Sequence, residues 1–493
     1  MSRSILPLVA TAAVLWSGSS ALAKSVKIHG YVTSIKSATE FEIDEYRITR
    51  DASLTLELEK SDDPEEITTF TPEEIRVGTE LEIRGELDEA TNQLTAKTIK
   101  VNLDEHLHLK RTALMEAAPE IRKAGNAWEG QIHIDGQRVT IDENTVVTIK
   151  PNSAQKKAAK DSEKAAQKRK QPGANSEGGE APSVVLKEPD QIPANTFVTY
   201  EGLRQKDGTV RAKKVEFQES EVTPGESRLW KTLTPKIKAA NFTNGRPGEL
   251  RIQQVGKFKL LPDAEVQKYV QDLGSSLIPK YQRELPAGDP QKIPFQFFVV
   301  DEKVPNAFAL ANGTVVIHSG LLTVLESEAQ LASVISHEIS HATEKHTYRQ
   351  MQYHKKALTA LKIGAAVGSI WGGRSVIDLA NLTEGAIRNG YSRSLENQAD
   401  RIGMEYMMTA GYDPREAARV WKVMAVKLGE QSTNFFWSNH DNHATRRTYL
   451  MAELRNNYSG IDFEGYKRNT ERFTAAVTAL KSRGAPKKIK VKY

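Results

Sequence analysis

Apolar and polar residues alternate along the first part of the chain. Between residues 26 and 101, segments such as SVKIHGYVTSI, FEIDEYRIT, LTLELE and TELEIRGEL place apolar side chains at about every second position, with turn residues between them. A period of two is typical of strands that bury one face. The pattern therefore predicts an all-β domain over residues 24–105.

A later segment repeats this pattern. TELEIRGELDEATNQLTAKTIKV resembles TFVTYEGLRQKDGTVRAKKVEF, with Gly85 falling on Gly202. The openings also match, since GYVTSIKSATEFEID from Gly30 and GQIHIDGQRVTID from Gly130 share a strand, a turn and a strand. We infer an internal duplication that makes two small OB-like barrels, the second over residues 126–220. Two unrelated β domains are the alternative.

A polar stretch interrupts the second unit. Residues 152–183, NSAQKKAAKDSEKAAQKRKQPGANSEGGEAPS, are rich in Lys, Ala, Glu, Ser and Gly and have no apolar face. Such a segment buries too little surface to offset the entropy of ordering it, so we expect a disordered insert. Its lysines suit a solvated spacer or, as a second interpretation, a peripheral contact with the membrane or the cell wall.

A helical period replaces the alternation near residue 227. In DAEVQKYVQDLGSSLIPKY, apolar residues recur every three or four positions from Val266 to Leu277, which is the spacing of one helix face. The pattern predicts a mainly helical domain over residues 227–475, which also contains the extended segment IPFQFFVVD. Residues 476–493 end in PKKIKVKY and are expected to form a basic tail.

The start of the chain predicts export. MSRSILPLVATAAVLWSGSSALAKS combines a basic residue, an apolar run and an A-x-A site, which indicates a cleaved signal peptide over residues 1–23. We expect a periplasmic protein, with secretion as the second choice. Cysteine is absent, so stability has to come from packed cores and bound metal.

The segment LASVISHEISHATEKH, residues 331–346, carries the most specific chemistry. His337 and His341 are four residues apart and share one helix face, so both can bind a single ion. Glu338 is turned about 100° from His337 around the helix, near enough to act as a general base. A partly buried helix with ordinary histidines is the alternative.

A third metal ligand has to come from another segment. In NGYSRSLENQADRIGMEYM, Glu396 and Asp400 are again four residues apart on a predicted helix. One carboxylate could bind zinc while the other orients a ligand histidine. A solvated helix face is the alternative for this pair taken alone.

The order of NAFALANGTVVIHSGLL, HEISH, ENQAD and SNHDNHATRR resembles zinc metallopeptidase family forty-eight, which contains HtpX, BepA and the CAAX prenyl proteases, and within it the soluble periplasmic branch. The similarity covers roughly residues 260–455. It implies a mainly α, gluzincin-type domain with a small β-sheet. It also implies one zinc ion per chain, with His337, His341 and Glu396 as ligands, Glu338 as the catalytic glutamate and Asp400 as the aspartate of the ExxxD motif.

The same resemblance implies a substrate strand and a later catalytic pair. The strand that pairs with extended substrate maps to Asn306, Ala307, Phe308 and Ala309. His440 and Arg446 match a catalytic histidine and arginine six residues apart, although Asp441 stands where the family has proline. His443 lies close by, so either histidine is placed to donate to the oxyanion or to occupy the open zinc position.

These patterns predict a multidomain exported enzyme, with two all-β units before the metallopeptidase domain. We expect a zinc endopeptidase that hydrolyses unfolded or misassembled envelope proteins, outer-membrane proteins among them, through a zinc-bound water activated by Glu338. A metal-binding chaperone or scaffold is the alternative. The net charge of +5 is small for 493 residues and does not indicate nucleic-acid binding. Residues 357–373 are expected to form an apolar lid, with a membrane-surface contact as the alternative.

Overall fold

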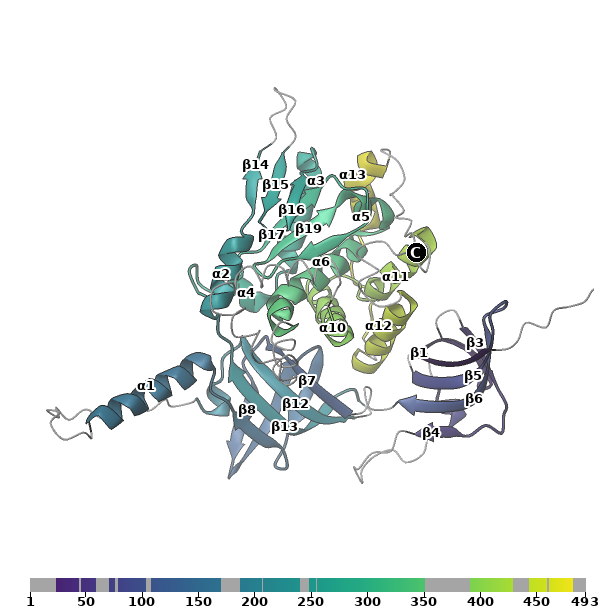
Figure 1. Cartoon of the computed structure of the whole chain (residues 1–493), viewed down its shortest axis with the longest axis horizontal. Coiled ribbons are helices and arrows are strands. Elements are labelled where there is room, and N and C mark those ends of the chain that lie inside the picture. Colours follow the sequence, from purple (N-terminus) through teal and green to yellow (C-terminus); the bar gives the residue numbers. More distant parts are fainter. Residues whose placement is uncertain are drawn as a thin grey trace, which may run out of the picture. The chain divides into compact units, whose positions relative to one another are not determined.

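The computed structural model describes residues 24–43, 46–58, 71–75, 79–102, 108–169, 187–205, 207–239, 248–253, 255–350, 391–428, 443–458 and 461–481 (Figure 1). The chain divides into two compact units, Met1–Ile75 with Glu80–Val101 and Arg76–Thr79 with Asn102–Tyr493. The predicted signal peptide, residues 1–23, and the predicted lid, residues 357–373, lie outside the described residues.

The first unit is a closed ring of strands. Its elements are β1 (Lys24–Ser37), β2 (Glu40–Ile43), β3 (Tyr46–Arg50), β4 (Leu56–Leu58), the 3-10 helix η1 (Pro72–Glu74), β5 (Glu80–Asp88) and β6 (Gln93–Asn102). The strand order is β3-β2-β1-β5-β6-β4, and a parallel pairing of β3 with β6 closes the ring. Its buried interior includes Val32, Phe41, Ile48, Leu81 and Leu94. The prediction of an all-β region is confirmed.

A second ring of strands, which we call the second β domain, belongs to the second unit. Its elements are β7 (His108–Met115), β8 (Glu120–Ala124), β9 (Ala127–Ile134), β10 (Gln137–Ile141), β11 (Val146–Ile149), η2 (Pro189–Gln191), β12 (Thr196–Arg204) and β13 (Val210–Glu219). The order is β10-β13-β12-β7-β9-β8, and β9 also pairs with β10. The domain starts at His108 and not at residue 126 as predicted, because β7 is the partner of β12.

The two rings share a close approach of strands at equivalent glycines. A Cβ atom added at Gly85 in β5 would lie 2.2 Å from the carbonyl oxygen of Thr95 in β6. A Cβ atom added at Gly202 in β12 would lie 2.3 Å from the carbonyl oxygen of Arg211 in β13. Each ring also contains a parallel pair that involves the second of these two strands, β6 with β3 and β13 with β10. This agreement supports the inferred duplication.

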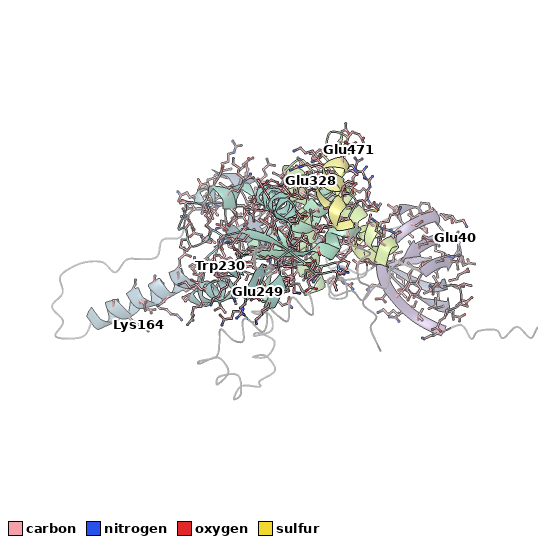
Figure 2. The ribbon with its side chains drawn as sticks, turned by 90° about the horizontal axis from the view of Figure 1, so that it is seen from above. Glu40, Lys164, Trp230, Glu249, Glu328 and Glu471 are labelled. Carbon is pink, nitrogen blue, oxygen red and sulfur yellow. The ribbon has the colours of Figure 1, made fainter. Side chains whose placement is uncertain are left out.

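The insert of the second β domain begins with a helix, α1 (Ser153–Arg169). Asn152 and Glu221 accept hydrogen bonds of 2.9–3.0 Å from main-chain N–H groups of its first turn. Alanine, lysine and glutamine favour helix, and the described lysine side chains, such as that of Lys164 (Figure 2), are exposed. The prediction of disorder is therefore wrong for α1, and residues 170–183 lie outside the described residues.

The remaining elements form a mainly helical region with two small sheets. They are α2 (Pro224–Leu233), β14 (Lys236–Lys238), β15 (Glu249–Ile252), β16 (Gly256–Lys259), α3 (Ala264–Leu277), α4 (Lys280–Glu284), β17 (Gln296–Val300), β18 (Ala307–Ala309), β19 (Thr314–His318), α5 (Ser319–Val324), α6 (Glu328–Thr343), α10 (Arg393–Thr409), α11 (Arg415–Leu428), α12 (His443–Asn457) and α13 (Thr470–Lys481). Because α13 extends to Lys481, the predicted tail from residue 476 starts too early. None of the helices within the described ranges is long and apolar enough to span a membrane.

The sheet of β17, β19 and β18 supports the helix that carries the HEISH motif. β17 runs parallel to β19 (Figure 1), and β18 pairs antiparallel with β19 at the edge. α3 packs on β17 through Gly274, where an added Cβ would lie 2.5 Å from the ring of Phe297. α6 packs against β18 and β19. This arrangement places the HEISH helix directly beside the edge strand.

A buried carboxylate anchors the start of α6. Glu328, labelled in Figure 2, is fully buried in the first turn of the helix. Its oxygens accept hydrogen bonds from the hydroxyls of Tyr269 (2.7 Å) and Tyr412 (2.9 Å) and from Nδ2 of Asn469 (2.6 Å). The negative charge also suits the positive end of the helix dipole. These contacts fix α6 to α3, to the turn after α10 and to the start of α13.

We expect Glu328→Ala to lower the free energy of unfolding by about 3 kcal/mol, because three buried or half-buried donors lose their acceptor. Urea denaturation of wild type and variant measures the difference. Glu326→Ala is the matched control. Glu326 forms a half-exposed ion pair with Lys427, so this change should cost less than about 1 kcal/mol. Equal losses in the two variants would contradict the anchoring role.

Candidate metal centre

Two helices bring the predicted ligands together. α6 carries His337 and His341 one turn apart, so both imidazoles leave the same face of the helix. α10 carries Glu396 in its first turn, where the helix dipole favours a carboxylate. The three residues have exposed fractions of 5%, 3% and 1%. Three donor groups are therefore held inside the domain, away from bulk water.

The donor atoms of these residues converge on one point. Nε2 of His337 lies 3.0 Å from Nε2 of His341. The Glu396 carboxylate approaches both, with Oε2 at 3.4 Å from the first nitrogen and Oε1 at 3.8 Å from the second. One ligand atom from each residue lies within 4.8 Å of the others. This spacing fits a single ion bound at about 2.0–2.2 Å.

The two helices are close enough for this geometry because α10 has a glycine at the contact. A Cβ atom added at Gly403 would lie 2.8 Å from the main-chain nitrogen of His337. One turn along α6, the Ser340 hydroxyl lies 2.7 Å from the carbonyl oxygen of His337 and 3.1 Å from that of Ala399 in α10. A larger residue at position 403 would separate the histidines from Glu396.

Asp400 and Arg446 position the other ring nitrogen of His337, Nδ1. Its Nδ1 lies 3.0 Å from Oδ1 of Asp400, and Arg446 of α12 donates from Nε to Oδ2 of Asp400 at 2.8 Å and from Nη2 to Oδ1. The Arg446 guanidinium lies 3.9 Å from the ring centroid of Trp421. Burial opposes ionisation of Asp400, but Arg446 and His337 outweigh it and keep the pKa of Asp400 below its usual value.

The chemistry of these groups fits a cation at the convergence point. Since Asp400 is a carboxylate, His337 donates through Nδ1 and turns the lone pair of Nε2 toward the other ligands. Burial and Arg446 lower the pKa of His337, but Asp400 and Glu396 outweigh them and raise it to about 9. The groups around His337 therefore favour a positive charge at the point where the three donor atoms meet. Two imidazole nitrogens and one carboxylate are a ligand set of catalytic zinc sites, which keep a fourth position open.

Residues 264–454 match the model of peptidase family M48. This part of the chain is similar to peptidase family M48. We call it the peptidase domain, and its cofactor is zinc. The first β unit matches a second model, a domain of unknown function (DUF5666), over residues 29–100.

Curated relatives match the chain through the same region. A beta-barrel assembly-enhancing protease from Escherichia coli (strain K12) is 32% identical over 177 residues, which are 34% of this chain and 34% of the relative. A mitochondrial metalloendopeptidase OMA1 from Arabidopsis thaliana is 32% identical over 162 residues, 33% of this chain and 32% of the relative. The chain thus spans about a third of the length of these relatives.

Glu338 of the peptidase domain lies between the ligands and the edge strand. It is 3% exposed, and burial raises its pKa to about 7, against the opposing effect of His337 and of a hydrogen bond from the main-chain N–H of Ala309. Ala309 is in β18, whose one pairing in the described part of the chain is with β19. The carboxyl group therefore lies beside the edge strand of the small sheet.

A residue that the sequence did not single out covers the second histidine. The ring of Tyr391 stacks on His341, with centroids 4.2 Å apart and planes at 19°. The main-chain N–H of Tyr391 lies 3.4 Å from Oε1 of Glu396, and its hydroxyl lies 2.8 Å from the hydroxyl of Thr347. A tyrosine five residues before a ligand carries no recognisable spacing signal. Only the packing of the folded domain reveals it.

Of the predicted catalytic pair, the structure describes Arg446 alone. Arg446 is 1% exposed and donates to Asp400, and its Nη1 atom also lies 3.5 Å from Oε2 of the ligand Glu396. His440 lies outside the described residues, and His443 is the first residue of α12. The predicted substrate residue Asn306 is buried, with its Oδ1 atom lacking a hydrogen-bond partner.

Proposed function

We propose that the protein is a zinc endopeptidase of the bacterial envelope that hydrolyses peptide bonds in unfolded or misassembled polypeptides. The observation that carries this proposal is the convergence of His337, His341 and Glu396 beside Glu338. The match of residues 264–454 to the model of peptidase family M48 supports the reaction class. The name of the Escherichia coli relative supports substrates related to outer-membrane β-barrels.

In this proposal each group of the site has one task. Bound zinc supplies Lewis-acid chemistry, which acidifies water and polarises a carbonyl group. Glu338 takes the proton of the attacking water and passes it to the leaving amine, a role that suits its raised pKa. Asp400 and Arg446 hold the His337 ring in the orientation that presents Nε2, so we assign Arg446 to positioning.

The edge strand is proposed to bind the substrate. Within β18, Phe308 lies opposite Val316 of β19, and the flanking groups of Asn306 and Leu310 also bond toward β19. By alternation, the main-chain groups of Ala307 and Ala309 face the other side of the strand. An extended peptide that pairs there is held mainly through its main chain, which gives broad sequence specificity.

The fold classes of the units are part of this proposal. The ring orders β1-β2-β3-β6-β5 and β7-β9-β10-β13-β12, each with one parallel pair, support OB-type barrels. The HEISH helix followed by a ligand glutamate on a second helix supports a gluzincin-type peptidase. The apolar start of the chain with its A-x-A site supports export to the periplasm.

Chelation tests the proposed activity. Treatment with 1,10-phenanthroline should abolish cleavage of unfolded casein, and one equivalent of zinc per chain should restore it, because the fitted donor set holds one ion. A metal-binding chaperone is the second candidate. It would suppress aggregation of unfolded proteins without producing fragments, so aggregation suppression by zinc-loaded protein with casein left intact would replace the endopeptidase proposal.

A further inference from the structure

The second β domain contacts the peptidase domain next to the metal ligands. The main-chain carbonyl of Thr112 in β7 accepts hydrogen bonds of 3.0 Å from Nε2 of Gln398 and from Nη2 of Arg349. The main-chain N–H of Leu114 in the same strand donates to Glu344 at 3.1 Å. Gln398 lies on α10 between Glu396 and Asp400. The contact therefore reaches the helix that supplies two residues of the metal centre.

Gln398 links this contact to a ligand histidine. Its other terminal atom, Oε1, lies 3.1 Å from Nε2 of His346. The Nδ1 atom of His346 lies 2.9 Å from Nδ1 of His341. The two imidazoles meet almost at right angles, with ring centroids 4.9 Å apart. A continuous chain of hydrogen bonds thus runs from β7 through Gln398 and His346 to His341.

The donor and the acceptor of each hydrogen bond in this network follow from the groups at its two ends. Gln398 has to turn its amide nitrogen to the Thr112 carbonyl, and Arg349, which only donates, contacts the amide oxygen at 2.7 Å. That oxygen accepts from Nε2–H of His346, so Nδ1 of His346 carries a lone pair. His341 then donates through Nδ1 and presents the Nε2 lone pair to the other ligands.

We propose that Gln398 and His346 are positioning residues of the metal centre, which fix the tautomer and ring orientation of His341, with Thr112 of the second β domain as their anchor. The inference rests on the proposed zinc site. It gives His341 the support that Asp400 and Arg446 give His337. His346 and Gln398 are buried, with exposed fractions of 0% and 3%, so water does not compete for these bonds.

Zinc affinity tests this role. Zinc alone is the probe, and a chromophoric chelator competes for it at a temperature where every variant is folded. His346→Phe removes the acceptor for Nδ1–H of His341. Gln398→Leu removes both the acceptor for Nε2–H of His346 and the donor to the Thr112 carbonyl. We expect each change to weaken zinc binding about 10–100-fold. Gln398→Glu keeps an acceptor for His346 but loses the donor to Thr112, so a smaller loss is expected.

Glu328→Ala separates positioning from general destabilisation. It weakens the far end of α6 and touches none of these residues, so its zinc affinity should stay within about twofold of wild type. In ¹⁵N-histidine spectra, wild type should show Nε2–H at His346, and Gln398→Leu should lose this preference. Unchanged zinc affinity in both His346→Phe and Gln398→Leu would overturn the inference while leaving the proposed function intact. Failure of the wild type to bind zinc would overturn both.

Discussion

Glu338→Gln should lower the rate of casein cleavage by about 10²–10⁴-fold, the usual contribution of a general base. The amide has nearly the size of the carboxyl group but cannot take a proton from water. Glu338 is not one of the three converging ligands, so zinc content should remain at one ion per chain. Cleavage is measured by release of fluorescent peptides, and zinc by mass spectrometry of the same sample.

Glu326, a half-exposed carboxylate just before α6, supplies the control for this variant. Glu326→Gln should cleave casein at the wild-type rate, because Glu326 pairs with Lys427 away from the ligands. Substrate should also accumulate on Glu338→Gln, since the edge strand and the metal are intact. Cleavage by Glu338→Gln within about threefold of wild type would show that another group takes the proton.

Glu396→Gln should lose zinc and activity together. A neutral amide is a poor zinc ligand. The whole ligand set of a structural zinc site contributes about 10–16 kcal/mol of binding free energy. Removing one of the three protein ligands should therefore weaken binding on the order of a thousandfold. Competition with a chromophoric chelator measures this change, and casein cleavage at limiting zinc should fall in parallel.

A second carboxyl group on α10 provides the matched control. Burial raises the pKa of Glu405, and its carboxyl group contacts Nδ1 of His133 at 3.1 Å and none of the metal ligands. Glu405→Gln should keep the zinc affinity of wild type. If Glu405→Gln and Glu396→Gln lost zinc to the same degree, the effect would come from disturbance of α10 and not from removal of a ligand.

The sequence was most informative where chemistry depends on local spacing. His337 and His341 share a helix face because they are four residues apart, and the same spacing puts Glu396 and Asp400 on one face of α10. His346 and Gln398 could not be found in this way, because their roles depend on contacts between α6, α10 and β7. Ordinary polar residues gain a specific function there only through tertiary packing.

For the fold too, local sequence patterns were predictive and tertiary contacts were not. Alternation of apolar residues predicted the strands of both β units, and Gly85 and Gly202 indicated their relationship. The start of the second β domain was misplaced because β7 precedes the repeated segment and is recognised only by its pairing with β12. The sequence pattern does not predict α1, because the helix has no apolar face and is stabilised by helix propensity and by the caps that Asn152 and Glu221 supply.

The zinc-edge X-ray absorption spectrum of the zinc-loaded protein tests the central claim most directly. We predict scattering from two imidazole rings with nitrogen at about 2.0–2.1 Å and from oxygen ligands at about 2.0–2.2 Å, in a four- or five-coordinate site. The imidazole signal should fall by half in His341→Ala. A wild-type spectrum of six oxygen ligands without imidazole scattering would contradict the assignment of His337, His341 and Glu396 as the zinc site.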